Sequence, residues 1–189
     1  MIHSLLGILV LLFPISEAAL GISRHTRGPA QTPANDRGSL RLLWIVIVIS
    51  VALAAAFSDY DRTRIHASRH VVESIALLVF LCGIILRWTS VMVLGKYFTV
   101  NVTVMKDHRV IDTGPYRYVR HPSYSGLLLA FLGLGLYFNN WLSVALIMLP
   151  VTLALLYRIR VEEAALGAAI GPEYAAYCAR TKRLLPGLL

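Results

Sequence analysis

Five long apolar runs occupy most of this 189-residue chain and restrict the folds it can adopt. A helix needs about 20 apolar residues to cross a bilayer. Here 57% of the residues are hydrophobic and 15% are charged, which is too apolar for a soluble domain of this size. We therefore predict an all-α, polytopic membrane protein with about five transmembrane helices. The runs cover residues 2–20, 40–57, 71–94, 123–138 and 141–157, and the last two are short.

The distribution of basic residues predicts how these helices are oriented. Residues 1–7 contain no Lys or Arg, so the first run lacks the positive start of a secretory signal and is interpreted as a retained helix. Fourteen of the 18 Lys and Arg residues lie in the segments after the first and third runs and in the C-terminal tail, whereas three lie on the other side. Because cytoplasmic segments carry the positive excess, we expect the N-terminus outside and the C-terminus in the cytoplasm.

The net charge of +8 indicates anionic partners. The basic residues follow the membrane topology and form no continuous stripe, so we expect anionic lipids and not nucleic acid. Cys82 and Cys178 have neither metal-ligand spacing nor a disulfide pattern, and no metal is expected. Arg87 is an ionisable residue inside a predicted span, which makes it a functional candidate whose role stays open.

Two polar clusters flank the last two apolar runs. The first is GPYRYVRHPSYSG at 114–126, and the second extends from residue 158 to residue 186. Only Asn139-Asn140 separates the two runs, so the helices must be antiparallel neighbours. Both clusters then emerge on the same side of the membrane, where they can form a single site.

The first cluster has the composition of an anion-binding helix start. Pro122 suits the first helical position, which leaves the N–H groups of Ser123 and Tyr124 directed out of the helix, with Arg120 and His121 beside them. Such a start can hold a carboxylate or a phosphate. An interfacial belt, in which tyrosine and arginine anchor a helix at the headgroups, explains the same residues.

The second cluster also allows two interpretations. Arg158 and Glu162 are four residues apart, as in an ordinary ion pair on a helix surface. Alternatively, a guanidinium just beyond the bilayer can receive the acidic group of a lipid-like molecule. Gly171-Pro172 predicts a break, followed by a short helix whose Tyr174 and Tyr177 can close over a bound ligand.

Together the two clusters resemble the isoprenylcysteine carboxyl methyltransferase family of integral membrane enzymes. The resemblance runs from about residue 95 to residue 186, through HRVIDTGPYRYVRHPSYSG (108–126) and EEAALGAAIGPEYAAYCARTKRLLP (162–186). It implies an S-adenosylmethionine-dependent methyltransferase acting on a lipophilic or prenylated acceptor from the membrane. The favoured acceptor is an isoprenylcysteine-like carboxylate, which would become an O-methyl ester.

The resemblance also implies a domain division and a set of site residues. Residues 1–94 would be a three-helix membrane region, and residues 95–189 a catalytic region made of a cytoplasmic loop, the helical hairpin 123–157 and a cytoplasmic helical tail. The implied cofactor-binding residues are His108, Val110, Gly114, Tyr116, Tyr118, Arg120, His121, Pro122, Tyr124, Glu163, Tyr174 and Tyr177. Arg158 and Glu163 match the family's catalytic arginine and glutamate, with Arg160 and Glu162 as close neighbours in register.

The acceptor chemistry stays open at this point. A carboxylate is already a nucleophile at neutral pH, so Arg158 would only need to orient it. A phospholipid amine or a small thiol must first lose a proton, for which Glu163 is the candidate base. A non-catalytic membrane protein that binds anionic lipid or a partner is the alternative from another class.

Overall fold

The computed structural model describes residues 7, 17, 38–99 and 109–185. Over these ranges the chain forms five α-helices and three short 3-10 helices, and no strand. The predicted all-α fold is therefore confirmed for the described residues. The first predicted run, residues 2–20, lies outside them except for Gly7 and Glu17. The α-helices are α2 (Ser39–Ala56), α3 (Arg69–Leu94), α4 (Pro122–Tyr137), α5 (Trp141–Ile170) and α6 (Pro172–Arg180), and the 3-10 helices are η1 (Asp61–Thr63), η2 (Gly95–Tyr97) and η3 (Gly114–Arg117).

Three of these helices are long and apolar enough to cross a membrane, as judged by length and composition. They are α2, α3 with its η2 extension, and α5, whereas the apolar α4 has only 16 residues. The total of about five spans stays a prediction. The apolar run 141–157 is short, but α5 has 30 residues, because the polar sequence after Tyr157 continues the same helix to Ile170. That sequence is rich in Ala, Glu and Leu, which are strong helix formers.

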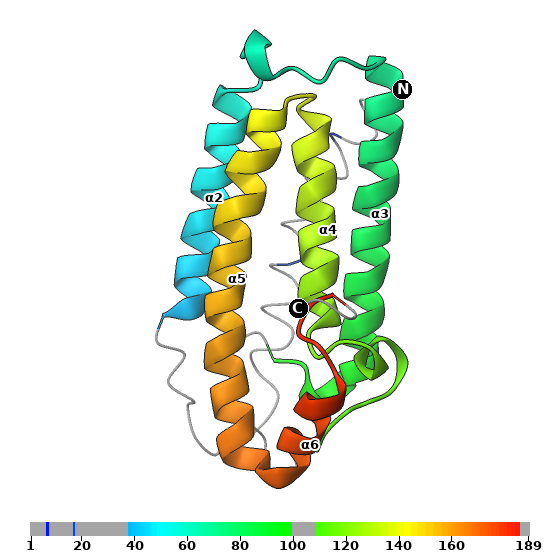
Figure 1. Cartoon of the computed structure of the whole chain (residues 1–189), viewed down its shortest axis with the longest axis vertical. Coiled ribbons are helices and arrows are strands. Elements are labelled where there is room, and N and C mark those ends of the chain that lie inside the picture. The colour runs from blue at the N-terminus through cyan, green and yellow to red at the C-terminus, as the bar shows by residue number, and fades with distance from the viewer. Residues whose placement is uncertain (1–6, 8–16, 18–37, 100–108, 186–189) are drawn as a thin grey trace.

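The four apolar helices lie side by side in the order α2, α5, α4, α3 (Figure 1). α4 and α5 form the predicted antiparallel hairpin, joined at Asn139 and Asn140. The Asn140 side chain is fully buried and accepts hydrogen bonds from the backbone N–H groups of Leu142 and Ser143, at 2.9 and 3.3 Å. This N-cap fixes the point at which α5 begins and therefore its register against α4.

α3 and α4 approach each other so closely that glycine is needed at the contact. A Cβ atom on Gly126 would lie 2.6 Å from the backbone N of Arg87, and one on Gly83 would lie 2.4 Å from the backbone N of Ala130. The face of α4 that carries Gly126 and Ala130 therefore packs against α3. Because Gly126 lies in the second turn of α4, this contact also positions the first turn, where the polar cluster begins.

The end of the chain folds back beside the segment that precedes α4. The Gly171 backbone has φ +70°, a conformation suited to glycine, and Pro172 begins α6, so the predicted break is confirmed. In the segment after α6, the carbonyls of Lys182 and Arg183 accept hydrogen bonds from the backbone N–H groups of Arg120 and His121, at 2.8 and 3.0 Å. These hydrogen bonds hold α6 against one end of the helix row, the end that the sequence predicts to lie in the cytoplasm (Figure 1).

Candidate active site

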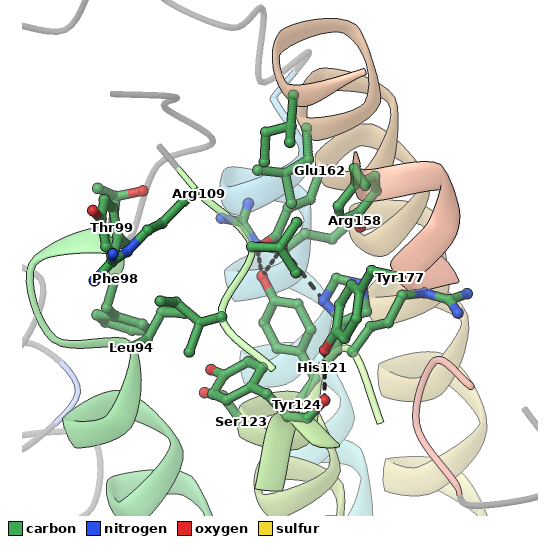
Figure 2. Close-up of a pocket in the computed structure, with 18 residues that line it drawn as sticks. Leu94, Phe98, Thr99, Arg109, His121, Ser123, Tyr124, Arg158, Glu162 and Tyr177 are labelled. Carbon is green, nitrogen blue, oxygen red and sulfur yellow. Dashed lines mark hydrogen bonds and ion pairs between the residues drawn. The ribbon is translucent and has the colours of Figure 1, made fainter. Parts of the chain in front are cut away.

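A cavity lies where the start of α4, the polar end of α5 and α6 converge (Figure 2). Its lining combines polar side chains with an apolar set that includes Leu94, Ile111 and Leu166. The predicted site residues in its wall are Val110, Tyr116, Arg120, His121, Tyr124, Arg158, Tyr174 and Tyr177. The structure therefore brings the two polar clusters of the sequence to one place.

The other predicted site residues do not line this cavity. Gly114 begins η3 with φ +57°, and Pro122 is the first residue of α4, so both shape the backbone that carries their neighbours. Tyr118 is 64% exposed. Glu163 lies just behind the wall, and His108 falls outside the described residues.

Tyr124 joins the charges of α5 within the cavity. The Arg158 Nε donates to the Tyr124 hydroxyl at 2.9 Å, and this hydroxyl donates to the Glu162 carboxylate at 2.8 Å. Figure 2 shows both α5 side chains reaching the phenol. Arg158 is 3% exposed, and its Nη1 also donates to the Ser39 hydroxyl at the start of α2. A desolvated guanidinium is thus fixed in place by contacts to two other helices.

Glu163 faces a different set of partners from Glu162. It accepts hydrogen bonds from Arg120 Nε and Arg183 Nε, both at 2.9 Å, and lies 3.4 Å from His121 Nε2. Arg120 also donates to the carbonyls of Cys178 and Thr181. Glu163 therefore connects the segment before α4 with the tail after α6, and its catalytic role stays a prediction.

The spacing along α5 explains which glutamate faces the cavity. Arg158, Glu162, Leu166 and Ile170 all line it, and they recur every four residues. Residues four apart lie on the same helical face, whereas Glu163 is rotated by roughly 100° from Glu162. This four-residue repeat was available in the sequence and is the signal that would have favoured Glu162.

Three buried tyrosines complete the wall. Burial raises the pKa of Tyr116 and Tyr174 well above the usual range and that of Tyr177 to about 12, so all three are neutral phenols at physiological pH. Tyr177 donates to the Tyr116 carbonyl at 2.7 Å. The Tyr174 hydroxyl, although buried, has no hydrogen-bond partner among the described residues. Buried hydroxyls are normally hydrogen-bonded, so this one indicates that a polar ligand binds beside it.

A second, largely apolar cavity of about 440 Å³ adjoins the first. It runs along α2, with Trp44, Val48 and Ala55 in its wall, and along α4, with Leu127 and Phe131. The residues that line both cavities are Phe98, Thr99, Tyr124 and Arg158. An apolar space and a polar space therefore meet at a buried arginine and a phenol. The sequence motifs did not indicate Ser39, Phe98 or Thr99, because these residues come from segments outside both polar clusters.

Fold and site together define a helical protein with helices apolar enough to cross a membrane. A polar cavity at one end of these helices adjoins a largely apolar cavity between them. A family model described as the isoprenylcysteine carboxyl methyltransferase (ICMT) family matches residues 75–168. The chain belongs to the isoprenylcysteine carboxyl methyltransferase family. The matched region contains the first polar cluster and both glutamates of α5, whereas α6 lies beyond it.

Individual relatives are similar to part of the chain. A protein-S-isoprenylcysteine O-methyltransferase of Schizosaccharomyces pombe is 36% identical over 109 residues, which is 56% of this chain and 46% of that protein. Protein-S-isoprenylcysteine O-methyltransferase B of Arabidopsis thaliana is 29% identical over 117 residues, 61% and 59% of the two chains. The chain thus matches about half of each of these relatives. The cobalt-zinc-cadmium resistance protein CzcN of Cupriavidus metallidurans is 29% identical over 153 residues, 77% of this chain and 63% of that protein.

Proposed function

We propose that this protein is a membrane methyltransferase that transfers a methyl group from S-adenosylmethionine to the carboxylate of an isoprenylcysteine-like lipid. The observation that carries the proposal is the meeting of a polar and an apolar cavity at Tyr124 and Arg158. A water-soluble methyl donor and a lipid acceptor need such adjoining spaces. The names of several relatives, protein-S-isoprenylcysteine O-methyltransferases, support the same reaction.

The polar cavity fits the donor. S-adenosylmethionine carries hydroxyl, amino and carboxylate groups together with an aromatic base. Arg120, His121 and the unpartnered Tyr174 hydroxyl offer hydrogen-bonding groups, while Ile111 and Leu166 offer apolar surface. Tyr116 and Tyr177 would complete the binding set. When bound, S-adenosylmethionine supplies a methyl group that is already activated by the positively charged sulfur. An oxygen nucleophile can therefore accept this methyl group directly.

The residues between the cavities would align the acceptor. Arg158 is buried and hydrogen-bonded to Tyr124 and Ser39, so its guanidinium is pre-organised to bind a carboxylate. A carboxylate is ionised at neutral pH and needs no general base. Glu162 places a negative charge in the polar wall, which favours a cationic ligand there. The apolar cavity would hold the isoprenyl chain and exclude water from the acceptor.

The test is transfer of labelled methyl from S-adenosylmethionine to an S-prenylated N-acetylcysteine in detergent. A methyl ester should form and should release methanol in mild base, whereas an N-methyl or S-methyl product is stable. The Arg158→Lys variant keeps the charge but loses the planar fork, so its turnover should fall about 100-fold with little change in donor affinity. Equal losses in turnover and affinity would place Arg158 in the donor site.

Two other results would redirect the proposal. Base-stable product would indicate an amine or thiol acceptor. Absence of saturable S-adenosylmethionine binding by calorimetry would instead favour a non-catalytic protein that binds anionic lipid.

We further infer from the distribution of Lys and Arg that the polar cavity opens to the cytoplasm, with the N-terminus outside.

A further inference from the structure

A second buried arginine, Arg87 of α3, lies in the wall of the apolar cavity and has no part in the chemistry above. Its Nε and Nη2 donate to the two carboxylate oxygens of Glu17, and its Nη1 donates to the Ser123 hydroxyl at 2.8 Å. The Arg87 and Glu17 side chains are 9% and 8% exposed. A bidentate ion pair is therefore withdrawn from water into a wall that is otherwise mostly apolar, which is a costly arrangement.

This ion pair lies at the same end of the cavity as the proposed acceptor-orienting residues. Arg87 binds Ser123, and Arg158 binds Tyr124, which is the next residue in the first turn of α4. The far part of the wall, including Val51, Ala52 and Leu134, is apolar. The cavity is thus polar at one end only, and its ligand should carry a polar head on an apolar chain.

The Glu17 carboxylate has hydrogen-bonding capacity beyond the arginine. A carboxylate offers about four acceptor positions, and Arg87 takes one on each Glu17 oxygen. Among the described residues that line the apolar cavity, Glu17 is the only carboxylate. An ionised carboxylate only accepts hydrogen bonds, so a ligand group that contacts it must be an N–H or an O–H.

We propose that Glu17, held in place by Arg87, binds an N–H group of the methyl acceptor while Arg158 binds its carboxylate. Glu17 would then be the residue that distinguishes an acceptor with an N–H group close to its carboxylate from a simple fatty acid. The inference rests on the proposed function and adds to it the group by which the enzyme distinguishes its acceptor from other lipid acids of the membrane.

Two matched acceptors test this inference in the full-length protein. N-acetyl-S-prenylcysteine carries an amide N–H beside the carboxylate, whereas the S-prenyl 3-thiopropionate with the same chain lacks it. Losing a hydrogen bond to a charged group leaves Glu17 under-solvated, so kcat/KM should be about 10-fold lower for the thiopropionate. Equal kcat/KM values for the two acceptors would overturn the inference and leave the proposed function intact.

Two variants separate recognition from structural support. Glu17→Gln keeps the size of the side chain and one oxygen for Arg87 but removes the charge. The double variant Arg87→Met with Glu17→Leu removes both charges together, an exchange that often preserves stability where removal of one partner does not. In both variants the preference for the N–H-bearing acceptor should fall to about 2-fold or less, with donor affinity retained as the check on folding.

A purely structural ion pair predicts a different pattern. It would lower kcat/KM for both acceptors by the same factor and leave their ratio unchanged in either variant, and that result would overturn the inference. If neither acceptor is methylated by the unaltered protein, the proposed function fails, and this inference fails with it.

Discussion

The Tyr124 phenol lies in the walls of both cavities and is hydrogen-bonded to the one arginine and the one glutamate that α5 contributes to the polar wall. Its position depends on the first turn of α4, and its partners depend on the four-residue repeat of α5. Substitution of neighbouring residues should therefore have sharply different effects, according to which face of a helix each residue occupies.

Tyr174→Phe should separate ligand binding from stability. The Tyr174 hydroxyl is buried without a partner among the described residues, so its removal should leave the free energy of unfolding unchanged or raise it by about 1 kcal/mol. The same change should weaken S-adenosylmethionine binding about 10-fold, as measured by calorimetry in detergent. Tyr118→Phe is the matched control, because Tyr118 is 64% exposed and lies outside the wall. Unchanged affinity in Tyr174→Phe would contradict the assignment of this hydroxyl to the donor.

Glu162→Gln and Glu163→Gln should fail in different ways. Glu162 lines the cavity, so its neutralisation should reduce methyl transfer about 100-fold with little effect on thermal unfolding. Glu163 binds Arg120 and Arg183, and its neutralisation should destabilise the protein by about 2 kcal/mol and expose the tail to proteolysis. The reverse pattern would support the catalytic role that the sequence predicted for Glu163.

At the scale of helices, the contact between α3 and α4 is made by backbones. Gly83 and Gly126 allow it, and Arg87 then reaches the first turn of α4. The positions of the Glu17–Arg87 pair and of the Tyr124 hydroxyl therefore both depend on the distance between α3 and α4. A change in that spacing should affect both cavities together.

Gly126→Ala should destabilise the protein by about 2 kcal/mol, because the added Cβ would lie 2.6 Å from the backbone N of Arg87 and force the helices apart. Gly167→Ala is the control in α5, where the nearest atom to the added Cβ is 4.0 Å away on the Tyr174 ring. That change should be neutral or stabilising by about 0.5 kcal/mol, since alanine favours a helix. Thermal unfolding in detergent measures both, and equal effects would contradict the close approach of α3 and α4.

At the scale of the whole molecule, the polar cavity lies at one end of the helix row, and the connection between α2 and α3 lies at the other (Figure 1). Asp61 in that connection and Glu173 at the start of α6 are both exposed. The two ends should therefore face opposite sides of the membrane.

Cysteine labelling checks the predicted orientation. In a background with Cys82 and Cys178 replaced by Ser, Asp61→Cys should react with a membrane-impermeant maleimide added to intact cells. Glu173→Cys should react only after permeabilisation, because the excess of Lys and Arg predicts a cytoplasmic location for the α6 end. Labelling in the opposite order would invert the topology and would place the polar cavity outside.

The sequence by itself determined the class of fold and the neighbourhood of the site. The apolar runs predicted the helices, the two-residue connection at Asn139-Asn140 predicted the hairpin, and Gly171-Pro172 predicted the break before α6, all because these signals are local. The two motifs predicted a single site, and the structure places Tyr116, His121 and Arg158 in the wall of one cavity. These predictions needed only the helical repeat and the length of a connection.

Only the tertiary structure decided which side chains face one another. It placed Glu163 against Arg120 and Arg183, whereas the four-residue repeat from Arg158 already favoured Glu162 for the wall. It also brought Ser39 to Arg158 and Glu17 to Arg87, across sequence separations of 119 and 70 residues. No local pattern encodes such pairs, because they depend on how helices that are distant in the chain pack together.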